Sequence, residues 1–212
     1  MICQVQTLQD AELAVAGGSD VLVAKGTEAG GHTGTVSLLP LLAGVVARFP
    51  DLPVLAAGGV ADGRTLAAAL TAGADGAWLG TAFLATPEAI EVDEIHKRLP
   101  VESDGCNTVF TKAYDIVSGL SWPVGIGERV RRNRFTDEWG EREAELRDGR
   151  SALASPPISN RFDAPFDLDT CAVLFGQSAG MIDSIRPAAE VVRSMSEEAE
   201  RILRTRPEAL LT

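Results

Sequence analysis

One of the two histidines of this chain lies in a loop that is rich in glycine. His32 stands in the segment KGTEAGGHTG, residues 25–34, which directly follows the apolar run at residues 21–24. An imidazole with its ordinary pKa of about 6.5 can take up or release a proton at neutral pH. The glycines leave room for a substrate and expose backbone N–H groups. The segment therefore indicates a catalytic role for His32, although a lone histidine is more often surface or core filler.

Two other titratable residues have open interpretations. Glu28 lies in the same loop, where it either orients the loop or His32, or is simply solvated. His96, the second histidine, lies in a charged segment that we predict to be helical. We interpret His96 as a residue without a catalytic role.

Three glycine-rich loops each follow an apolar run: Gly26–Gly34, Gly58–Gly63 and Gly80-Thr81. Parallel α/β proteins bind their ligands beyond the carboxyl ends of the strands, which is where these loops are expected. Many barrels build a phosphate site from their last two βα loops, and the second and third loops have that relation. The alternative is that the glycines only end strands and permit turns.

The elements that must position these loops alternate between strand and helix. A βα rhythm of this spacing is typical of a parallel sheet, and short strands that are apolar throughout are typical of strands covered on both faces. The predicted strands are residues 2–5, 21–24, 53–57 and 76–79, and the predicted helices between them are residues 8–16, 38–49 and 64–71.

The rhythm changes after Thr86-Pro87. We predict a helix at residues 89–98, a strand or extended arm at residues 107–117 and a charged, partly helical segment at residues 129–150. A loop or linker is predicted at residues 155–169, and a pair of amphipathic helices at residues 182–195 and 196–204.

Composition narrows the classes of function. A net charge of −11 argues against nucleic acid as a partner, and no apolar run has the roughly 20 residues of a membrane span. We interpret the basic cluster at residues 129–134 as solvated or ion-paired. The three cysteines are far apart, so we expect no disulfide framework and no metal site, but a reduced, cytosolic protein with buried, apolar cysteines. We expect no signal peptide, because the first residues do not have a basic region followed by an apolar stretch.

Three segments resemble the nitronate monooxygenase family, the FMN-dependent barrel enzymes once called 2-nitropropane dioxygenases. They are VLVAKGTEAGGHTG at residues 21–34, PVLAAGGVADGRTLAAALTAGADGAWLGTAFLAT at residues 53–86, and VLFGQSAGMIDSIRPAAEVV at residues 173–192. The motifs are long and ordered, and residues 87–170 match more loosely. The resemblance implies the α/β fold of a TIM barrel.

The resemblance also implies roles for individual residues. His32 would be the catalytic residue beside the flavin, and Gln177-Ser178 would close over the cofactor edge. Lys25 and Trp78 stand where the family often has glutamine; Lys25 would favour an anionic reduced flavin, or would point to solvent. The implied FMN-binding residues are Lys25, Gly30, Gly58, Gly59, Trp78, Leu79, Gly80 and Thr81.

The implied reaction is the oxidation of an alkyl nitronate by O₂ to a carbonyl compound and nitrite, with electrons passing through FMN. Relatives that share the AGGH loop resemble NAD(P)H-dependent quinone reductases or enoyl-acyl-carrier-protein reductases. The loops alone do not separate these activities, so a flavin reductase remains the alternative.

The number of strands predicts a partial TIM barrel. A (β/α)₈ barrel has eight strands, and only four βα units are found here, all before residue 86. We expect residues 1–100 to form a half-barrel with the FMN loops, and residues 101–212 a C-terminal extension with terminal helices. Such a half could reflect a misplaced start or boundary, an inactive gene remnant, or a half that assembles with another half in a homo-oligomer.

Overall fold

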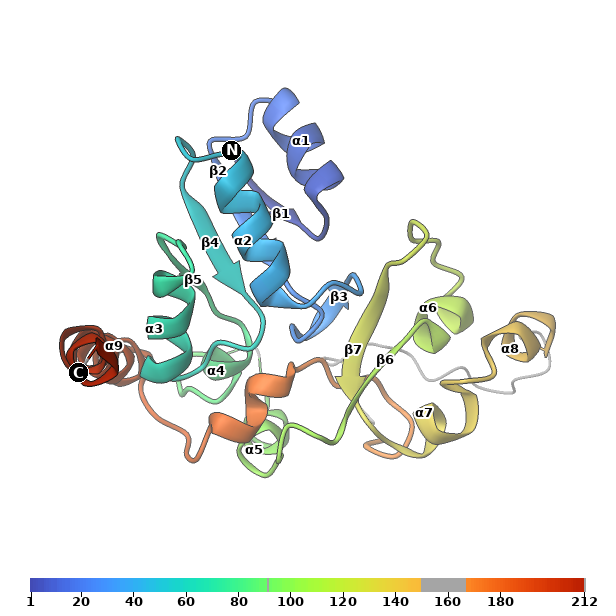
Figure 1. Cartoon of the computed structure of the whole chain (residues 1–212). Coiled ribbons are helices and arrows are strands. Elements are labelled where there is room, and N and C mark those ends of the chain that lie inside the picture. Colours follow the sequence, from blue (N-terminus) through green and yellow to red (C-terminus); the bar gives the residue numbers. More distant parts are fainter. Residues whose placement is uncertain (91, 150–166, 212) are drawn as a thin grey trace.

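A four-stranded parallel sheet forms the first part of the fold in the computed structural model, which describes residues 1–90, 92–149 and 167–211 (Figure 1). Its strand order is β1-β2-β4-β5, so each successive strand pairs with the one before it. The strands are β1 (Ile2–Val5), β2 (Val21–Lys25), β4 (Val54–Ala57) and β5 (Gly76–Trp78). The predicted α/β fold with a parallel sheet is confirmed, and the sheet does not close into a barrel within the described residues.

The helices that connect the strands cover this sheet. Apolar side chains of β2 meet those of the helices, and Leu22, Val23 and Ala24 are completely buried. Two helices begin at side-chain caps: the Thr7 side chain accepts from the backbone N–H of Asp10, and Asp62 forms a capping box with Thr65. The helices are α1 (Leu8–Ala16), α2 (Leu38–Arg48), α3 (Gly63–Thr71) and the short α4 (Thr81–Leu84).

A second sheet of three antiparallel strands has the order β3-β7-β6. Its strands are β3 (Gly31–Thr33), β6 (Thr108–Thr111) and β7 (Gly127–Arg131). Three helices lie beside it and share a separate hydrophobic cluster that includes Tyr114, Val130, Phe135 and Leu146. These helices are α6 (Ala113–Ser118), α7 (Arg134–Trp139) and α8 (Glu143–Gly149).

Several sequence predictions after residue 86 need correction. The helix predicted at residues 89–98 is α5 (Glu94–Val101), which begins late because the Asp93 side chain caps it by accepting the His96 backbone N–H. The segment at residues 107–117 contains both β6 and α6, and the segment at residues 129–150 begins with a strand. The predicted loop at residues 155–169 lies, as far as residue 166, outside the described residues.

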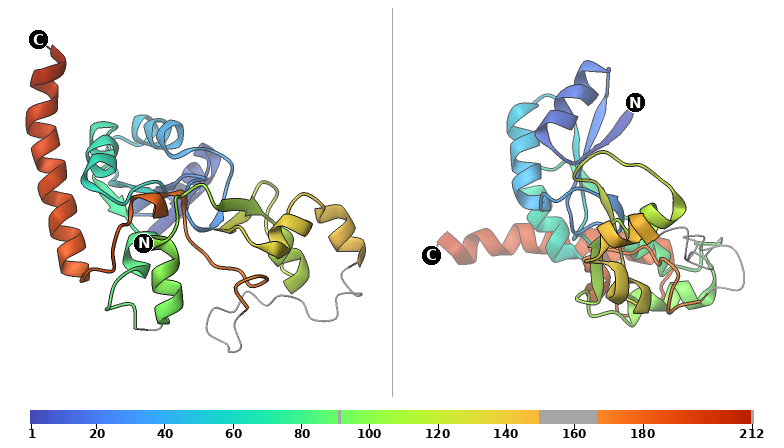
Figure 2. Two further views of the ribbon diagram at one scale, coloured as in Figure 1. Left: turned by 90° about the horizontal axis from the view of Figure 1, so that it is seen from below. Right: turned by 90° about the vertical axis from the view of Figure 1, so that its right-hand side faces the viewer.

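The predicted pair of C-terminal helices is one helix, α9 (Ala188–Leu211), which packs along α3 (Figure 2). Ser196, predicted as a helix start, lies within α9, and no glycine interrupts the chain there. Before α9, the 3₁₀ helix η2 (Gln177–Met181) ends the segment that returns to the parallel sheet. No helix in the described ranges is long and apolar enough to cross a membrane. Cys106 is exposed, contrary to the prediction of buried cysteines, while Cys3 and Cys171 are partly exposed.

Candidate functional site

A cavity of about 250 Å³ opens where β2, β4 and β5 end. We call it the glycine cavity. Six of the eight residues predicted to bind the cofactor line it, together with Ser178 of the predicted closing segment. The six are Lys25, Gly30, Gly58, Trp78, Gly80 and Thr81. Gly59, Leu79 and His32 are not in its wall, and Leu79 packs against the main hydrophobic cluster instead.

Two kinds of glycine occur in the wall of this cavity or beside it. Gly58 and Gly59 have φ angles of +94° and +71°, which side chains with a Cβ rarely adopt, and consecutive N–H groups in such turns can face an anion. Gly80 has an ordinary φ of −114°, and a Cβ added to it would meet no atom within 4 Å. The protein itself therefore does not require glycine at position 80, and the open space there suits a ligand.

Gly30 has a structural reason to be glycine. A Cβ on Gly30 would lie 2.6 Å from the carbonyl carbon of Phe175, and one on Gly176 would lie 2.5 Å from the carbonyl oxygen of Glu28. Gly176 also donates its backbone N–H to Oγ1 of Thr81 over 2.9 Å. The loop and the C-terminal segment thus cross backbone to backbone, and this crossing holds Phe175 and Ser178 in the cavity wall.

Glu28 orients the loop, which resolves the choice that the sequence left open. Both of its carboxylate oxygens accept the backbone N–H of Leu38, at 3.1 and 3.0 Å, so the loop is tied to the start of α2. On the other side, Nε of Arg129 donates to the carbonyl oxygen of Thr27 over 2.6 Å. The interpretation of the basic cluster as solvated or ion-paired holds for Arg132, because it pairs with Asp137. It does not hold for Arg129, which is 7% exposed and hydrogen-bonded to Thr27 and Thr108.

Lys25 ends β2 and lines the glycine cavity. Burial lowers the pKa of its ammonium group, because removal from water disfavours the charged form. No carboxylate in the described ranges lies within ion-pair distance of it. A partly buried cation without an acidic partner is suited to a ligand that carries negative charge.

His32 lies on β3, one residue beyond Gly31, which lines the glycine cavity. Its Nε2 is 2.9 Å from Oδ1 of Asp115, and its ring stacks on that of Trp122 with 4.1 Å between the centroids. Asp115 is on α6, and Trp122 is in the connection from α6 to β7. The second sheet therefore positions the imidazole, with a carboxylate at one ring nitrogen and an indole against one face.

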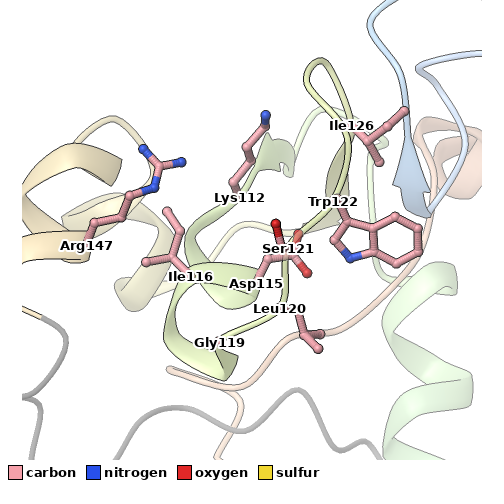
Figure 3. Close-up of a pocket in the computed structure, with 9 residues that line it drawn as sticks. All are labelled: Lys112, Asp115, Ile116, Gly119, Leu120, Ser121, Trp122, Ile126 and Arg147. Carbon is pink, nitrogen blue, oxygen red and sulfur yellow. The ribbon is translucent and has the colours of Figure 1, made fainter.

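Asp115 and Trp122 also line a second cavity of about 420 Å³ (Figure 3). Figure 3 shows the Asp115 carboxylate between the indole of Trp122 on one side and the side chains of Lys112 and Arg147 on the other. Sequence reasoning missed this group of residues. Asp115 lies in a segment that the sequence left open as a strand or an extended arm, and Trp122 follows that segment. Neither position carries a pattern that indicates a site.

Glu128 is the cross-strand partner of His32 in the β3–β7 pair, and only 2% of it is exposed. Burial, and to a lesser degree the negative charge of Asp115, raise the pKa of its carboxyl to about 8. Glu128 therefore holds a proton at neutral pH. One oxygen each of Glu128 and Asp115 is buried without a hydrogen-bond partner in the described part of the chain.

Comparisons with known proteins identify the family and related folds. The sequence model of the nitronate monooxygenase family matches residues 1–198. A nitronate monooxygenase from Neurospora crassa is 35% identical across 94% of this chain and 54% of its own length. The chain spans about half the length of the curated relatives it matches, with 51% and 54% coverage of two of them.

Two solved structures are similar along nearly the whole chain. FabK from Thermotoga maritima has a TM-score of 0.83 and 30% identity, over 98% of this chain and 63% of its own. A nitroalkane oxidase from Streptomyces ansochromogenes has a TM-score of 0.74 and 33% identity, over 96% of this chain and 58% of its own. The parallel sheet with its glycine cavity, the family match over residues 1–198 and these likenesses together show that the chain belongs to the nitronate monooxygenase family.

Proposed function

We propose that this chain acts in an FMN-dependent nitronate monooxygenase, which oxidises alkyl nitronates with O₂ to a carbonyl compound and nitrite. The observation that carries the proposal is that His32 directly follows Gly31, a residue of the glycine cavity wall, and that its imidazole is hydrogen-bonded to a buried carboxylate. A residue that can exchange protons is thus joined through the backbone to a space suited to a phosphate-bearing cofactor.

The cavity residues fit a flavin mononucleotide. The consecutive left-handed glycines Gly58 and Gly59 and the unfilled space at Gly80 suit the phosphate, and the amine of Lys25, which has no acidic partner within the described residues, would interact with a negatively charged ligand. We propose Leu79, Trp78, Thr81 and Gly30 as further binding residues. The bound flavin would accept electrons from the nitronate and pass them to O₂. His32 would hold the nitronate anion, or would remove the proton α to the nitro group of the parent nitroalkane, which leaves the nitronate.

We also propose how the described elements relate to a complete barrel. We propose that the four βα units are the C-terminal four of a (β/α)₈ barrel, in residues 1–100, and that residues 101–212 form an extension that packs on it. The strand order supports this, because barrel strands are likewise added one after another in sequence. A homo-oligomer and a cytoplasmic location remain part of the proposal.

The alternative is an NAD(P)H-dependent flavin reductase of the quinone or enoyl-acyl-carrier-protein type, and the likeness to FabK favours it. The test is to purify the chain with added FMN, record its visible spectrum, and measure O₂ consumption with propionate 3-nitronate and absorbance loss with NADH. Oxygen uptake with the nitronate and no NADH oxidation is the expected result. NADH oxidation alone would support the reductase, and a colourless protein that binds no FMN would support an inactive remnant.

A further inference from the structure

We propose that Asp115 is a positioning residue for His32: its carboxylate accepts the Nε2 proton of the imidazole, so Nδ1 is the nitrogen that exchanges protons with the substrate. This inference rests on the proposed function and assigns a residue and a ring nitrogen within that site. Asp115 does not touch the glycine cavity itself.

The His32–Asp115 pair has the geometry of a hydrogen bond. Nε2 of His32 and Oδ1 of Asp115 are 2.9 Å apart, which is the distance of a charge-assisted hydrogen bond. The Asp115 side chain is 7% exposed and that of His32 is 26% exposed. The carboxylate is thus shielded, while the imidazole still has an open side. No other hydrogen bond of the His32 ring is formed within the described residues.

The second step is the choice of donor in this hydrogen bond. Asp115 presents Oδ1 to Nε2 from the first turn of α6. A carboxylate can only accept hydrogen bonds, so the proposal assigns the proton to Nε2 and leaves Nδ1 without one. The neighbouring acid, Glu128 on β7, is 2% exposed, and burial raises the pKa of its carboxyl to about 8.

The third step is the restraint on the ring. Trp122 stacks on the imidazole with an angle of 24° between the planes, which limits rotation of the ring about its own axis. With the ring plane and the Nε2 proton both fixed, the lone pair of Nδ1 has a single direction. A general base needs this arrangement of geometry and tautomer.

The chain offers a control, because within the described residues each of its two histidines is hydrogen-bonded to an aspartate. Nδ1 of His96, on α5, is 2.8 Å from Oδ1 of Asp93, and neither residue lines the glycine cavity. Asp93→Asn removes that carboxylate but keeps a residue that caps helices well. Asp115→Asn and Asp93→Asn each remove one carboxylate from one histidine, although the Asp93 side chain is 53% exposed and that of Asp115 is 7% exposed.

The experiment is nitrogen-15 NMR of the imidazoles in the full chain at alkaline pH, with His96→Gln used to assign the signals. We expect a protonated Nε2 and an unprotonated Nδ1 for His32, with a slowly exchanging Nε2 proton that disappears in Asp115→Asn and persists in Asp93→Asn. A His32 ring protonated at Nδ1, or an Nε2 proton signal unchanged in Asp115→Asn, would overturn the proposal. Circular dichroism verifies that each variant is folded.

Kinetics with 3-nitropropionate, which unlike its nitronate still carries the proton α to the nitro group, give the second readout. If Asp115 positions the base, Asp115→Asn lowers kcat by about 100-fold or more with little change in KM. A change in KM alone would contradict a positioning role. If the wild-type chain has no nitronate activity at all, the proposed function fails, and the NMR result still decides whether Asp115 fixes the tautomer.

Discussion

At the scale of single residues, the sequence could identify the groups whose type alone is informative. A histidine among glycines after a buried strand indicated His32, and glycines at strand ends indicated Gly58 and Gly80. Asp115 and Trp122 could not be found in this way, because one acid and one indole in segments of unclear structure carry no signal. Their role depends on a hydrogen bond that spans 83 positions of the chain, which no local pattern encodes.

The first prediction concerns His32 itself. Asn has a similar shape but lacks the imidazole that would hold the nitronate or take the α proton of the parent nitroalkane, so His32→Asn should lower turnover by between about 100-fold and 10,000-fold. Because His32 does not line the glycine cavity, the variant should keep its FMN, as judged by its visible spectrum. His96→Gln is the control and should keep its turnover. Equal turnover in His32→Asn and the wild type would rule out a catalytic His32.

At the scale of elements, the βα units were predictable and the second sheet was not. The four strands of the parallel sheet are also short, but each is a largely apolar run that alternates with a helix at regular spacing. β3 is the sequence GHT inside a glycine-rich loop, and β6 lies after this alternation has ended, so neither shows the same pattern. The prediction of two C-terminal helices was wrong because a local pattern was given too much weight. Ser196 with the following glutamates has the pattern of a helix start, but it lies inside the longer, uninterrupted helix α9.

The second prediction separates the two kinds of glycine. Gly30→Ala places a Cβ against the Phe175 backbone, where no side chain can move aside, so it should destabilise the fold by about 1–3 kcal/mol. Gly80→Ala meets open space, so its stability should stay within about 0.5 kcal/mol of the wild type while its FMN affinity falls. Urea unfolding and FMN titration measure the two quantities. Equal FMN affinity in Gly80→Ala would remove Gly80 from the binding site.

At the scale of the whole molecule, the buried acid on β7 should make stability depend on pH. The folded state raises the carboxyl pKa of Glu128 from 4.5 to about 8, so between these values the folded chain holds a proton that the unfolded chain has released. The stabilising contribution of this proton to the free energy of unfolding is fully present below pH 4.5 and is lost as the pH rises through about 8.

The third prediction follows from this linkage. Between pH 5 and 8, the free energy of unfolding of the wild type should decline more steeply than that of Glu128→Gln, by at most about 1.4 kcal/mol per pH unit. Gln has the same shape without a titrating proton. Urea unfolding at a series of pH values measures both slopes. Parallel curves for the two proteins would show that Glu128 titrates normally in the folded state.

The central claim is that nitronate electrons enter a flavin held in the glycine cavity beside His32. The most direct measurement mixes the FMN-loaded chain with propionate 3-nitronate under anaerobic conditions and follows flavin absorbance near its visible maximum. The account predicts that the nitronate bleaches the flavin, that admission of O₂ restores the colour, and that His32→Asn bleaches far more slowly. A flavin that stays oxidised with the nitronate but is bleached by NADH would contradict the account.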